Sequence, residues 1–135
     1  MIGLVRPVGF YSELDERNPS LYVGSIADAI RDSASANEAE IVRYLESGIT
    51  LIDIMEAGKD VISGDEYVTG CSSVLTDGTW IWRLDLPYYV NRYHLSLDSD
   101  FLDHLAKLGY VMPQLEREQV IPIARDVIFN VLGMR

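Results

Sequence analysis

Apolar residues change their spacing along the chain, and the change predicts helices toward both ends with strands between them. Apolar positions that recur every three or four residues mark one face of a helix. They recur in this way over about 25–34, 38–47, 86–93, 99–108 and 120–131. We therefore expect helices over these segments, the first of them short.

Two segments between or before these helices have the composition of strands. Residues 2–11 combine apolar side chains with two glycines and a proline, which suits an extended segment at the edge of a sheet. Residues 49–55 follow a helix directly, are rich in β-branched side chains and are apolar on both faces. This second pattern predicts a strand in the centre of the sheet.

The clearest turn signal predicts a hairpin over residues 72–83. The Asp-Gly dipeptide at 77–78 suits a two-residue type I′ turn between strands. In that register Ser73 faces Trp82, and the small serine leaves room for the indole. Trp80 and Trp82 then share one face of the hairpin, because alternate residues of a strand point to the same side.

Length and element order together indicate the fold class. The chain has 135 residues, of which 48% are apolar and 24% charged, and such a length and composition fit one globular domain. Helices before and after a central group of strands predict a single α+β domain over residues 1–135. Its small, mainly antiparallel sheet is expected to pack against several helices.

The charge of the chain is acidic, and the acid is concentrated in the middle third. There are 21 Asp and Glu against 11 Lys and Arg, a net charge of −10, and residues 37–70 hold eight acids and two bases. Nucleic acids and anionic membranes both attract Lys and Arg, so this balance argues against either as a partner. A basic protein is the natural complement.

Cysteine content and hydropathy indicate where the protein works. Cys71 is the single cysteine, so no disulfide can form within the chain, and a reducing compartment is expected. The longest apolar stretches fall far short of the roughly 20 residues that span a bilayer, and the first residues lack a signal-peptide pattern. These features predict a cytoplasmic protein.

Residues for the common kinds of catalysis are few and poorly spaced. No His-Glu-x-x-His, Cys-x-x-Cys, phosphate-binding glycine loop or Gly-x-Ser-x-Gly occurs, so neither a metal nor another cofactor is expected. One alternative stays open, a small enzyme or small-molecule-binding domain with a pocket near Cys71, Trp82, Tyr93 and His94. Catalysis there would need the thiol within hydrogen-bond reach of His94 or His104.

One block of sequence resembles a group of small acidic bacterial proteins. Residues 76–94 read Thr-Asp-Gly-Thr-Trp-Ile-Trp-Arg-Leu-Asp-Leu-Pro-Tyr-Tyr-Val-Asn-Arg-Tyr-His and continue to Phe101 and His104. In that group Asp-Gly-x-Trp-x-Trp is followed by Asp-Leu-x-Tyr-Tyr-Val and a short helix. These proteins are similar in type to the immunity proteins that accompany secreted toxins. The resemblance implies a non-catalytic protein that neutralises a toxin, and it carries over no site residues.

The acidic middle third is the candidate surface for a basic toxin, because complementary charge raises the association rate and fixes register. Tyr88 lies off the buried stripe of its helix, so we expect it to be exposed. An accessory subunit with an apolar patch or a symmetric dimer is a third possibility, and the sequence does not indicate the oligomeric state. The candidate contacts are Asp53, Glu56, Asp60, Asp65, Glu66, Tyr88 and Arg92.

Overall fold

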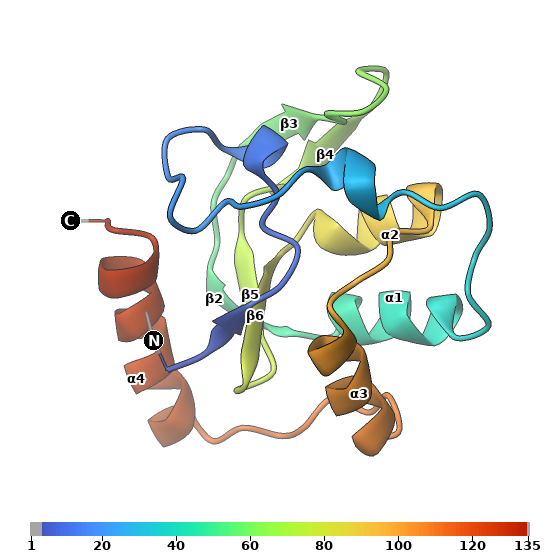
Figure 1. Ribbon diagram of the computed structural model, residues 1–135. Coiled ribbons are helices and arrows are strands. Elements are labelled where there is room, and N and C mark those ends of the chain that lie inside the picture. Colours follow the sequence, from blue (N-terminus) through green and yellow to red (C-terminus); the bar gives the residue numbers. More distant parts are fainter. Residues whose placement is uncertain (1–3, 135) are drawn as a thin grey trace.

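The computed structural model describes residues 4–134, in which helices cover both faces of a four-stranded sheet (Figure 1). The strand order is β1 (Arg6–Pro7), β6 (Trp80–Arg83), β5 (Val74–Thr76) and β2 (Ile49–Ile52). The β1–β6 pair is parallel and the other two pairs are antiparallel. The predicted α+β class with a mainly antiparallel sheet is therefore confirmed.

Three helices cover one face of this sheet, and a fourth covers the other (Figure 1). The first three are α1 (Glu38–Glu46), α2 (Leu86–Tyr93) and α3 (Ser99–Lys107), and each matches its predicted segment to within one residue. On the opposite face, α4 (Arg117–Asp126) continues directly into a π-helical turn, η3 (Val127–Val131). No helix within residues 4–134 has both the length and the apolar character that a membrane crossing needs.

The N-terminal part of the chain is less helical than predicted. It contains two single 3₁₀ turns, η1 (Ser12–Leu14) and η2 (Ile26–Ala29). The second replaces the helix expected over 25–34, because the backbone beyond it bonds elsewhere. The carbonyl of Ala29 accepts from the N–H of Ser96 at 2.8 Å instead of extending a helix.

The β2 strand lies at an edge of the sheet, so its predicted central position is wrong. Its apolar character on both faces has another cause, a bulge in the pairing with β5 between Thr50 and Ile52. Leu51 and Ile52 both pack into the apolar cluster that faces α4. An edge strand with one face buried by a helix can thus have the same apolar sequence pattern as a strand in the interior of a sheet.

The β5–β6 hairpin has the predicted faces but a register shifted by two residues, with Trp82 opposite Leu75 and not Ser73. The carboxylate of Asp77 accepts from the N–H of Trp80 at 2.8 Å, which enlarges the turn. Room for the indole comes from Gly48, where a Cβ would lie 2.7 Å from Cζ2 of Trp82. Because a shift of two preserves the alternation, both tryptophans still share one face.

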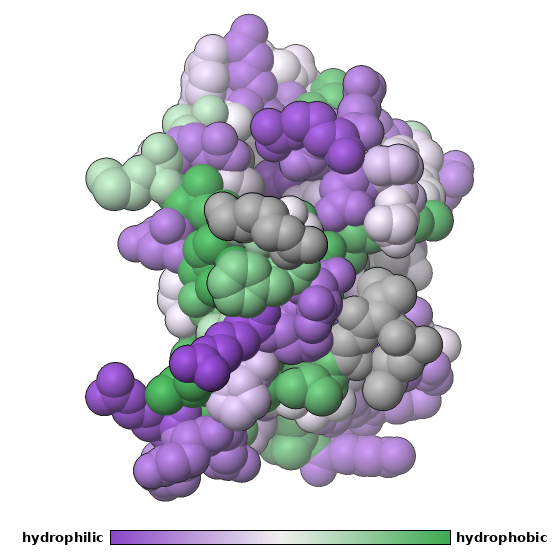
Figure 2. All heavy atoms as spheres, turned by 90° about the vertical axis from the view of Figure 1, so that its left-hand side faces the viewer, coloured by the Kyte–Doolittle hydropathy of each residue, from purple (hydrophilic) through white to green (hydrophobic). Residues whose placement is uncertain are grey.

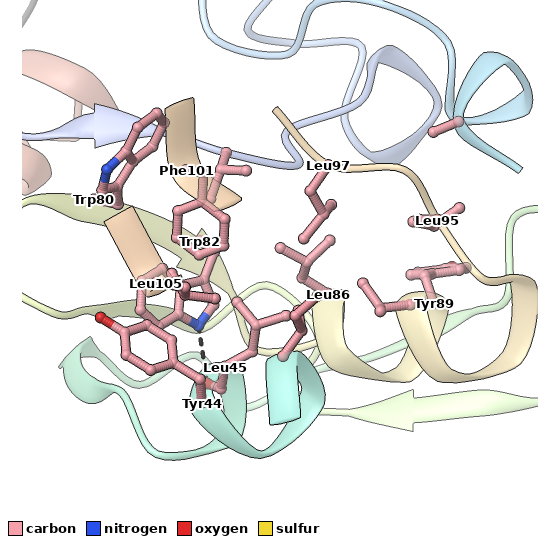
Figure 3. Packing of buried hydrophobic residues seen from close by; sticks show 14 of the residues in the cluster. Tyr44, Leu45, Trp80, Trp82, Leu86, Tyr89, Leu95, Leu97, Phe101 and Leu105 are labelled. Atoms are coloured by element: carbon pink, nitrogen blue, oxygen red, sulfur yellow. Dashed lines mark hydrogen bonds between the residues drawn. The ribbon is translucent and has the colours of Figure 1, made fainter. Parts of the chain in front are cut away.

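The larger core lies between the sheet and the three helices α1 to α3 (Figure 3). Phe101 of α3 meets the rings of Trp80 and Trp82 edge to face, with centroids 5.2 and 5.8 Å away. The indole Nε1 of Trp82 donates to the carbonyl of Leu45 at 2.9 Å (Figure 3). This contact joins the hairpin to the last turn of α1 and satisfies the one polar atom of a fully buried ring.

A smaller apolar cluster lies on the other face of the sheet, where Val74 and Ile81 meet Ile123, Val127 and Val131. Figure 2 shows the outer side of the molecule that carries α4, with apolar side chains gathered near its centre and hydrophilic ones around them.

A second, two-stranded sheet stands apart from the first. It pairs β3 (Ala57–Lys59) with β4 (Tyr67–Thr69) in antiparallel register. We call residues 57–69 the arm. The arm projects beyond the main sheet on the side of α2 (Figure 1), and it contains several of the predicted contact residues.

Candidate functional site

The arm is fastened to α2 by Asp60, a predicted contact residue that is buried and only 1% exposed. Its Oδ2 accepts from the hydroxyls of Tyr88 and Tyr93, at 2.7 and 2.6 Å, and from Nη1 of Arg92 at 3.1 Å. Its Oδ1 accepts from two backbone N–H groups of the turn that follows, at 2.8 and 3.0 Å. The carboxylate is thus saturated by internal donors and has no surface to offer to a partner.

This hydrogen bonding also determines the ionisation of Asp60. Burial by itself would raise the pKa of the carboxyl, but the hydrogen bonds from Tyr93, the turn backbone and Tyr88 outweigh it and lower the pKa below its ordinary value. The pKa values of its two tyrosine partners shift in the opposite direction. Burial and the neighbouring carboxylate raise the pKa of both Tyr88 and Tyr93. At neutral pH Asp60 is therefore a carboxylate with neutral phenols bonded to it.

Tyr88 and Arg92 belong to the same attachment. The hydroxyl of Tyr88, predicted to be exposed, is held by Asp60, and the residue is half-buried. Arg92 donates to Asp60 and also forms a bidentate pair with Asp65. In this pair Nη1 and Nη2 of Arg92 lie 3.0 and 3.1 Å from the two carboxylate oxygens of Asp65. Hydrogen bonding to Asp65 raises the pKa of Arg92 and lowers that of Asp65. Both α2 residues hold the arm, and Arg92 keeps part of its surface exposed.

The remaining four acidic residues of the prediction are exposed, at the two ends of the arm. Asp53 and Glu56 lie at its base, where serine hydroxyls bond to their carboxylates. Asp65 and Glu66 lie at its tip. Three paired residues per strand, at about 3.3 Å each, separate the two groups by roughly 10 Å.

Two apolar side chains that the sequence analysis did not select lie among these acids. Met55 is 96% exposed and Tyr67 is 63% exposed. The sequence did contain a signal for their exposure, because Met55 precedes Glu56 and Tyr67 follows Glu66 in the chain. We call the exposed set the acidic arm surface, and it consists of Asp53, Met55, Glu56, Asp65, Glu66 and Tyr67.

Neither histidine lies with Cys71. Nδ1 of His94 is 3.0 Å from both carboxylate oxygens of Glu38 at the start of α1. Nε2 of His104 is 2.8 Å from the buried Asp77 in the hairpin turn, which also accepts from the hydroxyl of Tyr44. Both rings are thus bonded to carboxylates at helix and hairpin junctions, and the Cys–His pair that catalysis in the enzyme alternative would need is not assembled.

Cys71 itself is a buried free thiol below the arm. A Cβ at Gly58 would lie 2.8 Å from its Sγ, so the arm packs closely on it. Burial raises the pKa of the thiol, with a smaller contribution from Asp85. Since the thiolate is the reactive form, this environment disfavours nucleophilic chemistry.

A groove of about 370 Å³ passes over Cys71 and has a buried ion pair on its floor. Arg83 and Asp85 are bonded through two parallel contacts of 3.1 and 2.9 Å, and their side chains are only 5% and 3% exposed. Burial raises the pKa of Asp85 to about 6 against the opposing charge of Arg83. The outer nitrogen of Arg83 has longer contacts, 3.4 Å to the Tyr22 hydroxyl and 3.5 Å to the Leu14 carbonyl.

Within residues 4–134, no three His, Cys, Asp or Glu side chains are grouped so as to hold a metal ion. No protein-family model matches the sequence, and neither a curated protein nor a solved structure matches it. The resemblance to immunity proteins therefore stays a prediction.

Proposed function

We propose that this chain is a non-catalytic, immunity-type protein that binds and neutralises a basic toxin domain in the bacterial cytoplasm through its acidic arm surface. The observation that carries the proposal is the exposure of Met55 among carboxylates at the base of the arm. Apolar groups near the centre of an interface provide much of its binding energy, and charges around them provide orientation.

The dimensions of this surface suit a partner protein. Its two acidic groups are roughly 10 Å apart along the arm, and a standard interface covers about 800 Å² on each partner. One docked domain therefore contacts both groups at once. Met55 lies between Asp53 and Glu56 in the chain and Tyr67 follows Glu66, so each acidic group includes an exposed apolar side chain of its own.

The attachment of the arm supports binding without a large rearrangement. Asp60 holds the tip against α2 through three donors of that helix, and two backbone N–H groups of its own turn complete its hydrogen bonds. The exposed carboxylates of Asp65 and Glu66 are consequently presented on an ordered backbone. Less conformational entropy is then lost when a partner docks.

The test uses a charge-neutralised variant, Asp53→Asn/Glu56→Gln/Asp65→Asn/Glu66→Gln, as bait beside the wild type in lysate of the producing cell. We expect the wild type to retain one basic protein that is released as salt rises, since exposed charge pairs are screened. The variant should retain it at least about tenfold more weakly, because the surface loses four negative charges, of which that of Asp65 is already paired with Arg92. Its neutralising effect should fall in parallel when the captured protein is tested for toxicity in cells.

The matched control neutralises four acidic residues elsewhere and changes the net charge equally. Undiminished binding by the arm variant, or an equal loss in the control, contradicts the proposal. So does a captured protein whose toxicity the wild type leaves unchanged. The control substitutions are Asp32→Asn, Glu40→Gln, Asp103→Asn and Glu118→Gln.

A second candidate function, binding of a small molecule, is supported by the groove over Arg83 and Asp85. Perturbed ionisable groups in a cleft are typical of functional sites, and a buried ion pair adds little to stability. A ligand in this groove would cover Cys71. It would therefore slow alkylation of the thiol, and a screen of small charged metabolites with that readout tests this candidate.

A further inference from the structure

A separate groove of about 410 Å³ runs between α1, α2 and the arm. Its lining is largely apolar, with Val42 and Leu45 from α1, Val68 from the arm, Leu75 from the hairpin and Leu84 just after it, and Asn91 of α2 adds a polar side chain. The ring of Tyr88 completes one wall. That ring is held in place, because its hydroxyl donates to the buried Asp60 at 2.7 Å.

The groove has one charged residue, and it stands at the rim. Glu46, in the last turn of α1, lines the groove and is exposed. Among residues 4–134 its carboxylate has no hydrogen bond or ion pair. The C-terminal end of a helix also carries partial negative charge. The rim therefore attracts a cation while the walls bind apolar atoms.

This combination selects one class of side chain. A purely apolar group would fill the walls but leave the Glu46 carboxylate without a partner. A short polar group would reach the rim but leave the walls empty. Arginine has both an aliphatic stem and a planar cation that can bond to a carboxylate and stack on an aromatic ring.

We propose that the groove between α1, α2 and the arm holds an arginine side chain of the protein partner. The stem lies along Val42, Val68 and Leu84, and the guanidinium pairs with Glu46 and stacks against Tyr88. The inference rests on the proposed function, since it names the chemistry of one anchoring residue on the basic partner. Arginine in an apolar pocket is a frequent hot spot of protein interfaces.

The experiment is a methyl NMR titration of the full chain with N-acetyl-arginine amide. We expect the methyl signals of Val42, Val68 and Leu84 to shift, with a Kd in the millimolar range that suits a probe of about fifteen non-hydrogen atoms. N-acetyl-citrulline amide keeps the shape without the charge, and N-acetyl-norleucine amide keeps only the stem. Both should bind at least about fivefold more weakly, because neither carries the positive charge that forms an ion pair with Glu46.

Two variants complete the test. Glu46→Gln should weaken the arginine probe at least about fivefold, whereas Glu118→Gln, an equal charge change on α4, should leave its Kd unchanged. Absent methyl shifts, equal binding of the norleucine probe, or no effect of Glu46→Gln would overturn the inference. Capture by the acidic arm surface involves neither Glu46 nor these methyl groups. The two proposals can therefore fail separately.

Discussion

The hydroxyl of Tyr93 donates a hydrogen bond to the carboxylate of Asp60 at 2.6 Å, and this bond joins the last turn of α2 to the tip of the arm. Tyr88, five residues earlier on the same helix, donates to the same oxygen at 2.7 Å. This buried carboxylate is thus a central link between the arm and α2, beside the Arg92–Asp65 pair and the bond from the Val61 N–H to the Tyr89 hydroxyl. The exposed acids at the tip of the arm, Asp65 and Glu66, depend on it in part for their position, although Asp60 itself is out of reach of a partner.

Removal of this charge should destabilise the protein strongly. Asp60→Asn replaces an ionised acceptor of five hydrogen bonds with a neutral amide that cannot accept all of them. We expect the free energy of unfolding to fall by about 2–4 kcal/mol, measured by urea denaturation. Tyr93→Phe removes one donor and should lose about 1–2 kcal/mol.

Matched controls separate the buried network from a general effect of these substitutions. Asp32→Asn and Tyr67→Phe make the same chemical changes at exposed positions. Both should stay within about 0.5 kcal/mol of the wild type. An Asp60→Asn protein as stable as these controls would show that the network does not hold the arm.

The same carboxylate should make stability depend on pH in acid. The pKa of Asp60 is lowered in the folded protein, whereas an unfolded Asp titrates near 3.9. The folded state therefore binds fewer protons, and the stabilisation by Asp60 is complete above the unfolded pKa and is lost as the pH falls below it.

Urea titrations at several pH values between about 5 and 2 measure this dependence. The free energy of unfolding of the wild type should fall more steeply with acidification than that of Asp60→Asn. Parallel slopes for the two proteins would mean that Asp60 has the same proton affinity in both states.

The attachment also explains which parts of the site could be predicted. Exposure of Asp53, Glu56, Asp65 and Glu66 follows from local acidity, which keeps side chains in water. The role of Asp60 depends on partners about thirty residues away on α2, and no pattern of spacing within the arm reveals them. Carboxylates a few residues apart in the chain therefore have different roles, since Asp60 is buried and holds the arm whereas Asp65 and Glu66 are exposed.

The fold shows a similar division between local and distant causes. Helices α1, α2 and α3 agree with their predicted bounds, because spacing and caps are local signals. The faces of the β5–β6 hairpin follow from alternation, which survives a shift of two residues. Its register depends on the Asp77 side chain bonding to the backbone of Trp80. The strand β2 is apolar on both faces although it lies at an edge, because α4, distant in the sequence, covers one face and a bulge lets Leu51 and Ile52 both pack there.

The close approach of Gly48 to Trp82 gives a prediction about packing. Gly48→Ala places a Cβ 2.7 Å from the indole and 3.0 Å from Cβ of Leu75. The indole cannot move aside, since its Nε1 is bonded to the Leu45 carbonyl. We expect a loss of about 1–3 kcal/mol in the free energy of unfolding.

Gly58→Ala is the informative comparison, because its Cβ would lie 2.8 Å from Sγ of Cys71, the end of a short side chain. Combining it with Cys71→Ala removes that sulfur, so the double variant should recover part of the stability lost by Gly58→Ala. No such recovery is possible for Gly48→Ala. An equal loss from both single glycine variants, with no recovery by Cys71→Ala, would indicate backbone strain in place of side-chain crowding.

The buried pair of Arg83 and Asp85 gives the last prediction. Its parallel contacts of 3.1 and 2.9 Å lie between side chains that are almost fully covered. Arg83→Met leaves the carboxylate of Asp85 buried without its cation, and should lower the free energy of unfolding by about 3–5 kcal/mol. Asp85→Asn leaves the guanidinium uncompensated and should have an effect of similar size.

The double variant Arg83→Met/Asp85→Asn buries no charge at all. Its stability should therefore be higher than the sum of the two single losses implies, with a coupling energy of about 2–3 kcal/mol in the double-mutant cycle. A pair kept for stability alone would make the double variant the least stable of the four proteins. A double variant close to the wild type would instead mean that the ion pair contributes little to folding. Its charges would then be available for recognition in the groove over Cys71, and the cycle would favour the second candidate function.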